Sequence, residues 1–197
     1  MYGRTLAGMR VYEAMKAIDY LLLRPDVNPE RIGVFGFSGG SLIAAMASGL
    51  DERVKAAVLC GWTNTFQGSI LAMHHCIDNY LPGILLDAEQ PELAGLIAPR
   101  ALFVESGEQD RIFPAGHVRQ AISILEETYA AWGVQEQLAY DIHSGGHEIS
   151  GKKLIWLAVW EAELPEHRNV AWLNSSPRTA DSRTAGVSAK AQVMDKI

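Results

Sequence analysis

The chain has 197 residues, of which 48% are hydrophobic and 20% are charged, and its formal net charge is −6 at pH 7. This composition excludes a disordered or fibrous protein and predicts one globular domain. The acidic balance, with no cluster of lysines and arginines, argues against a nucleic-acid partner. The longest apolar runs are too short to span a membrane, so we expect no membrane association.

The first predicted elements are a helix, a buried strand and a second helix. Apolar residues at helical spacing between residues 11 and 22 predict an amphipathic helix. This helix ends before Pro25, because proline disfavours helical geometry in the residue that precedes it. The apolar run Ile32–Phe37 then predicts a buried strand, and residues 42–47 predict a compact helix of small and apolar side chains.

Strands and helices continue to alternate along the rest of the chain. Strands are predicted at Val54–Cys60, 101–105 and 137–142, and helices at 118–132 and at the Trp-rich segment 152–163. This alternation predicts an α/β fold, a mostly parallel sheet of about four strands with helices on both faces. We assign residues 1–173 to this domain and expect the Ser-, Thr- and Ala-rich tail 174–197 to be disordered.

Residues 61–100 form a connection between the second and third strands that is longer than a simple crossover needs. Long connections of this kind often cover a binding site, so we interpret the segment as a lid-like insertion. Trp62, His74 and Tyr80 are its candidate substrate-pocket residues. The run His74-His75-Cys76 is also compatible with metal ligands, but adjacent histidines on a helix point apart, which favours a pocket wall.

The main chemical motif is Gly-Phe-Ser-Gly-Gly at residues 36–40, which fits the pattern G-x-S-x-G. It lies where a predicted strand turns into a predicted helix, the position in which a sharp turn exposes the serine hydroxyl as a nucleophile. Ser38 is therefore the candidate nucleophile. The N–H of Gly39, at the start of the helix, is the candidate oxyanion donor.

A serine nucleophile needs a base and a carboxylate that orients the base, and both follow in the sequence. Asp110 lies after the third predicted strand and His147 after the fourth. The carboxyl ends of parallel strands meet at one edge of the sheet, and Ser, Asp, His is the chain order of this architecture. Glu108 remains an alternative carboxylate. His143 is expected to pack or to face solvent.

Metal and cofactor binding are not expected. His143 and His147 have a spacing that could bind zinc on a helix, but two glycines lie between them and argue against a helix there. The chain has two cysteines, Cys60 and Cys76, which are too few for a disulfide framework. We therefore expect a reducing, cytoplasmic environment.

With these residues in place, the segment from about residue 4 to residue 164 resembles the α/β-hydrolase superfamily. It is most similar to the dienelactone-hydrolase-like and acetyl xylan esterase branch. The resemblance rests on residues 28–33 that lead into the serine motif, on Asp-Asn-Tyr-Leu-Pro-Gly at 78–83, and on Ile-Ala-Pro-Arg at 97–100. Asp110 and His147 match the acid and base positions of the family. Dienelactone hydrolases use a cysteine nucleophile, so Ser38 shifts the expected substrate towards carboxylic or acetyl esters.

One departure from this family concerns the strands before the nucleophile. In the superfamily the nucleophile follows the fifth strand of the sheet, whereas here only one helix precedes it. The first four strands, and the loop that supplies the second oxyanion N–H, are expected to be missing. Ile32–Phe37 would then be an exposed apolar edge, and such edges pair with other chains. We therefore expect a homodimer or higher oligomer that covers this edge.

The sequence thus predicts a serine hydrolase that cleaves small carboxylic esters through an acyl-enzyme intermediate. Two alternatives stay open. The same motif order serves peptidases and acylaminoacyl-type hydrolases. A truncated hydrolase could also retain its triad as an inactive relic, since folds are reused without their function.

Overall fold

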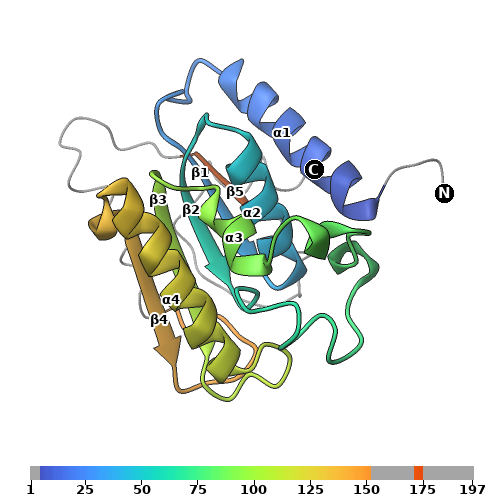
Figure 1. The fold of residues 1–197 in the computed structure, drawn as a ribbon. Coiled ribbons are helices and arrows are strands. Elements are labelled where there is room, and N and C mark those ends of the chain that lie inside the picture. The colour runs from blue at the N-terminus through green and yellow to red at the C-terminus, as the bar shows by residue number, and fades with distance from the viewer. Residues whose placement is uncertain (1–4, 152–170, 175–197) are drawn as a thin grey trace.

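A computed structural model describes residues 5–151 and 171–174 of the protein. Within these residues, helices and strands alternate and build one parallel sheet (Figure 1). The elements in chain order are α1 (Leu6–Leu22), β1 (Ile32–Phe37), α2 (Gly39–Leu50), β2 (Val54–Cys60), η1 (Ile77–Asn79), η2 (Ile84–Leu86), α3 (Gln90–Gly95), β3 (Ala101–Gly107), α4 (Ala115–Trp132), η3 (Gln135–Gln137), β4 (Leu138–His143) and β5 (Ala171–Asn174).

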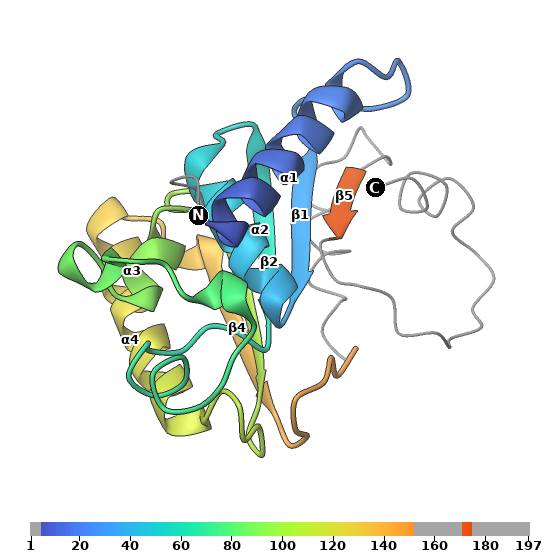
Figure 2. The same cartoon turned by 90° about the vertical axis from the view of Figure 1, so that its right-hand side faces the viewer.

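The sheet has the strand order β4-β3-β2-β1-β5, and every neighbouring pair is parallel. Figure 2 shows the helices α1 and α2 packed along β1 and β2. The predicted α/β fold with a parallel sheet flanked by helices is confirmed. Because the strands are parallel, the carboxyl ends of β1 to β4 lie at one edge of the sheet, towards which β2 and β4 point downwards in Figure 1.

The four strands predicted from apolar runs are all present, and β1 and β2 have the predicted bounds. The helices α1 and α2 begin earlier than predicted. Helix α1 starts at Leu6 because the hydroxyl of Thr5 caps it by accepting a hydrogen bond from the N–H of Gly8, at 3.0 Å. Helix α2 starts at Gly39, immediately after the turn at Ser38, in a stretch whose glycines carry no helical periodicity.

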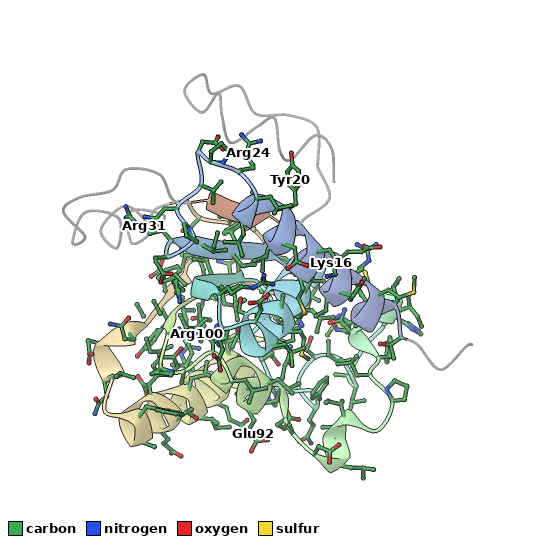
Figure 3. The ribbon with its side chains drawn as sticks, turned by 90° about the horizontal axis from the view of Figure 1, so that it is seen from above. Lys16, Tyr20, Arg24, Arg31, Glu92 and Arg100 are labelled. Carbon is green, nitrogen blue, oxygen red and sulfur yellow. The ribbon has the colours of Figure 1, made fainter. Side chains whose placement is uncertain are left out.

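The insertion 61–100 contains short helices that the sequence pattern did not predict. Helix α3 begins with a capping box, in which the Glu89 side chain accepts from the backbone of the first turn and the Glu92 side chain accepts from the N–H of Glu89. At the end of the insertion Arg100, labelled in Figure 3, donates to the carbonyls of Asp51 and Val54. These bonds tie the insertion to the loop between α2 and β2.

Two groups of buried apolar side chains hold the layers together. The larger one joins the helices α1 to α4 to one face of the sheet, with Ile18, Leu42, Leu102 and Leu125 among its fully buried members. The smaller one lies on the alternate residues of the central strands and consists of Val58, Cys60 and Phe103, with Phe35, Phe37 and Ala139 packed against it. Because successive side chains of a strand point to opposite faces of the sheet, the two groups lie on opposite faces.

The expectation of an exposed edge at Ile32–Phe37 is wrong for most of that strand. Residues 171–174 form β5, which pairs with β1 from Ile32 to Phe35. A four-residue strand far along the chain carries too little periodicity to be recognised from sequence. The helix predicted over 152–163 lies outside the described residues. So does the tail predicted from residue 174, except Asn174, which ends β5.

Candidate active site

Ser38 occupies a strained turn between β1 and α2. Its φ is 54° and its ψ is −124°, and within residues 5–151 it is the one non-glycine residue with a positive φ. The chain passes so close to itself here that a Cβ on Gly36 would lie 2.4 Å from the carbonyl oxygen of Gly40. Glycine at position 36 is therefore required for the sharp strand-to-helix turn that exposes the hydroxyl of Ser38.

Hydrogen bonds to β2 fix this turn. The N–H of Ser38 donates to the carbonyl of Cys60 at 2.8 Å. The hydroxyl of Ser41, fully buried, donates to the carbonyl of Gly36 at 2.7 Å and accepts from the N–H of Cys60 at 2.9 Å. The turn is thus bonded to Cys60 of β2 by both Ser38 and Ser41.

His147 connects Ser38 to Asp110. Its Nε2 lies 2.9 Å from Oγ of Ser38, and its Nδ1 lies 2.7 Å from Oδ2 of Asp110. The carboxylate holds the proton on Nδ1, so the lone pair on Nε2 faces the serine hydroxyl. The three residues that the sequence selected from separate loops are brought into one hydrogen-bonded chain.

The surroundings of Asp110 keep its side chain ionised. Burial by itself would raise the pKa of Asp110, but hydrogen bonds from His147 and from the N–H groups of Phe113 and Ile112 outweigh it and lower the pKa below its usual value. The two backbone bonds, at 3.0 and 2.8 Å, both reach Oδ1 and leave Oδ2 to His147. A fixed negative charge therefore faces the imidazole.

Glu108, the alternative carboxylate, and His143, which is expected to pack or to face solvent, both lie outside this hydrogen-bonded chain. Glu108 is half exposed and pairs with Arg119 on α4, so it is not the carboxylate bound to His147. His143 is buried at the end of β4, where its Nδ1 accepts from the N–H of Gly145 and its Nε2 donates to the carbonyl of Glu148. His143 therefore braces the loop that carries His147.

Aromatic rings flank the imidazole of His147. Phe113 stacks on it with a centroid distance of 5.6 Å and an interplanar angle of 21°, and Phe37 lies tilted at 4.9 Å. The ring centroid of His75 lies 5.4 Å from that of Phe113. Burial lowers the pKa of His75, the hydrogen bond with Ser69 opposes this, and His147 lowers it slightly further.

The predicted pocket residues of the insertion have different environments. His74 is exposed, whereas its neighbour His75 lies near Phe113. The sequence alone does not tell which of two adjacent histidines faces the site. Trp62 is buried and donates from Nε1 to Oδ1 of Asn79 at 3.2 Å, so it ties the insertion to the end of β2. Tyr80 is 39% exposed, and its hydroxyl accepts from the N–H of His75.

Tyr80 also lines an apolar cavity of about 520 Å³ that lies within the insertion. Its walls come from residues of the segment 66–86, among them Phe66, Ile70, Leu81 and Ile84. Ser38, Asp110 and His147 are not among these wall residues. The cavity is therefore lined by residues of the insertion, and Ser38 is not part of its wall.

Asp78 is a buried residue that the sequence reasoning did not select for the site. Its Oδ2 lies 3.8 Å from the position that a Cβ on Gly39 would take, and its Oδ1 accepts from Nδ2 of Asn79 at 3.3 Å. A carboxylate at this position is favoured by the positive end of the dipole of α2. In the sequence, Asp78 is marked only as the first residue of the segment 78–83, one of the segments on which the family resemblance rests.

Residues 5–151 and 171–174 hold no group of three or more His, Cys, Asp or Glu side chains placed to bind a metal ion. No helix in this part of the chain combines the length and apolar character that crossing a membrane requires.

Comparison with known proteins supports the resemblance to hydrolases. Residues 12–129 match the family described as BAAT / Acyl-CoA thioester hydrolase C terminal. YtaP of Bacillus subtilis (strain 168), a protein named as a hydrolase, is 32% identical over 151 residues, which cover 74% of this chain and 50% of YtaP. The chain thus spans about half the length of this relative.

Solved structures show the same fold. A family 15 glucuronoyl esterase from Caldicellulosiruptor kristjansonii superposes with a TM-score of 0.65 at 18% identity, over 87% of this chain and 53% of the esterase. A protein described as an acetyl xylan esterase, from Bacteroides fragilis NCTC 9343, has a TM-score of 0.55 at 18% identity, over 70% of this chain and 36% of its own. The resemblance to the α/β-hydrolase superfamily is confirmed.

Proposed function

Since the chain belongs to the family of BAAT and acyl-CoA thioester hydrolase C-terminal domains, we propose that it is a serine hydrolase of small carboxylic esters of the acetyl type. The observation that carries this proposal is the hydrogen-bonded chain from Ser38 through His147 to Asp110, together with the strained backbone of Ser38. This combination activates a hydroxyl for attack on a carbonyl carbon.

In this reaction Ser38 Oγ attacks the ester carbonyl while Nε2 of His147 takes the hydroxyl proton. The imidazolium that forms is stabilised by Asp110, whose side chain is fully buried and ionised. His147 then gives the proton to the departing alcohol, which leaves an acyl group on Ser38. Water activated by the same imidazole hydrolyses this acyl-enzyme and restores the serine.

We assign the stabilisation of the oxyanion, the negatively charged oxygen that forms when the carbonyl is attacked, to the N–H of Gly39, the first residue of α2. At the start of a helix this N–H has no partner in the preceding turn, and the helix dipole favours negative charge there. A second donor would contribute about 10²- to 10³-fold in turnover.

The test is hydrolysis of p-nitrophenyl acetate by the wild type and by Ser38→Ala. The variant should lose activity by about 10⁴- to 10⁶-fold, as expected when a triad member is removed. Ser48→Ala is the matched control, because Ser48 lies on the same helix and its buried hydroxyl has no hydrogen-bond partner among the described residues. Equal rates for the wild type and Ser38→Ala would refute the proposal.

Thioesters are a second substrate class, favoured by the match of residues 12–129 to a thioester hydrolase family. The attack on a thioester carbonyl uses the same serine, base and oxyanion donor, and differs only in the thiolate that leaves. Acetyl-CoA hydrolysis, followed through the free thiol released, compares the two classes at equal concentrations. Ser38→Ala should abolish whichever activity is found.

A further inference from the structure

Glu105 is a buried acid that the proposed mechanism does not use. It lies on β3, where it pairs with Cys60 of β2 and Asp141 of β4, and only 1% of its surface is exposed. A buried carboxylate costs free energy unless hydrogen bonds compensate for the water that it loses. Its hydrogen-bond partners therefore indicate what the fold gains from it.

Both carboxylate oxygens of Glu105 bind one residue of the loop that carries His147. Oε1 accepts from the N–H of Ser150 at 2.9 Å, and Oε2 accepts from the hydroxyl of Ser150 at 3.0 Å. Ser150 follows His147 by three residues. In Figure 2 the segment after β4 turns back at the lower edge of the sheet. The two hydrogen bonds to Glu105 place Ser150 beside β3.

The other side of the same loop is held by separate contacts. The N–H of Gln109 donates to the carbonyl of Gly145 at 2.9 Å, and the N–H of Glu108 donates to the carbonyl of His143 at 2.7 Å. These bonds fix the loop before His147. After His147 the loop is held at two points, by His143, whose Nε2 donates to the carbonyl of Glu148, and by Glu105, which binds Ser150. The bonds to Glu105 are charge-assisted, and such bonds are stronger than neutral ones.

We infer that Glu105 is a positioning residue that holds His147 at hydrogen-bond distance from both Ser38 and Asp110. This inference rests on the proposed hydrolase function, because its benefit is a base kept in line with the nucleophile. A displacement of about 1 Å in such a group is enough to lower turnover by about 100-fold. The Glu105 carboxylate binds Ser150, and neither of these two hydrogen bonds involves Ser38 or His147.

Two substitutions separate the hydrogen bonds from the charge. Glu105→Met has a similar volume and removes both bonds to Ser150. Glu105→Gln keeps both, because its amide oxygen accepts from the N–H of Ser150 and its amide nitrogen donates to the hydroxyl of Ser150. We expect kcat for p-nitrophenyl acetate to fall by about 10- to 100-fold in Glu105→Met, with KM nearly unchanged. Glu105→Gln should stay within about threefold of the wild type.

A second readout follows His147 directly. The proton on Nδ1, bound to Asp110, resonates far downfield in proton NMR while the imidazole is held in place. This resonance should persist in the wild type and in Glu105→Gln, and should broaden by exchange with water in Glu105→Met. Melting temperatures measured in parallel report any effect on the fold alone, which by itself would not change kcat of the folded enzyme.

The outcomes are distinguishable. Glu105→Met with the kcat and the NMR resonance of the wild type overturns the inference. Equal losses in Glu105→Gln and Glu105→Met also overturn it, because the charge and not the bonds to Ser150 would then matter. A wild type without any hydrolysis refutes the proposed function, while the NMR comparison still tests whether Glu105 positions His147.

Discussion

Gly107 and Gly146 approach each other so closely that a Cβ on Gly107 would lie 2.0 Å from the carbonyl oxygen of Gly146. Gly107 ends β3, three residues before Asp110, and Gly146 immediately precedes His147. The close approach therefore sets the spacing between the loop that carries Asp110 and the loop that carries His147.

Gly107→Ala should weaken both the fold and the activity. The added methyl group must push the two loops apart, which we expect to cost about 1 to 3 kcal/mol in the free energy of unfolding. The shift would also separate His147 from Asp110 or Ser38 and lower kcat by about 10- to 100-fold. Urea unfolding and ester hydrolysis measure the two effects. An alanine variant with wild-type kcat would contradict this reading of the contact.

Gly116→Ala is the matched control for that substitution. A Cβ on Gly116, in the first turn of α4, meets no atom within 4 Å. Alanine reduces the freedom of the unfolded chain and suits a helix better than glycine. We expect the free energy of unfolding to rise by about 0.4 to 1 kcal/mol, with unchanged activity.

The acid stability of the fold should depend on Asp110. Its pKa is lower in the folded chain than in the unfolded chain, so its contribution to stability is present above the unfolded value of about 4 and is lost as the pH falls through the folded value. The difference in unfolding free energy between the wild type and Asp110→Asn should therefore shrink between pH 5 and pH 3. Urea titrations at each pH measure it, and a constant difference would argue against an ionised, stabilising Asp110.

The two cysteines should differ in reactivity. Burial, with a smaller contribution from the Glu105 carboxylate, raises the pKa of the Cys60 thiol well above its usual range, whereas Cys76 is exposed. Since the thiolate is the reactive form, iodoacetamide should modify Cys76 alone in the folded chain and both cysteines in guanidinium. Mass spectrometry of Cys76→Ser under native conditions should show no adduct. An adduct on Cys60 would contradict the burial described here.

Self-association should depend on β5. We propose that a chain shortened to end at residue 170 forms dimers or larger assemblies through β1, because its apolar edge then lacks the strand that pairs with Ile32 to Phe35. Light scattering at micromolar concentration should give a larger mass per chain for the shortened form than for the full chain. Equal masses would show that this edge does not drive assembly.

The elements that the sequence predicted best are those with a strong local signal. The apolar runs of β1 and β2 lie in the middle of a parallel sheet, where burial on both faces produces continuous hydrophobic stretches. Ser38, Asp110 and His147 were found for a related reason, because each follows a predicted strand and parallel strands end at a common edge. Local pattern and topology together were sufficient for these three residues.

Other features depend on contacts that no local pattern records. Glu105 looks like any polar residue at the end of a strand until Ser150, 45 positions later, is seen to bind it. The pairing of β5 with β1 likewise joins segments more than 130 positions apart. The choice between His74 and His75 depends on how the insertion turns, which sequence spacing alone does not fix.

The strained backbone of Ser38 also has a cost in the stability of the fold. A serine with φ of 54° costs the fold on the order of 1 to 3 kcal/mol, and glycine at the same position would relieve much of that cost. A lineage that no longer needed the nucleophile would gain stability by exchanging it for glycine. Ser38→Gly should therefore raise the free energy of unfolding while it removes the hydroxyl on which the proposed hydrolysis depends.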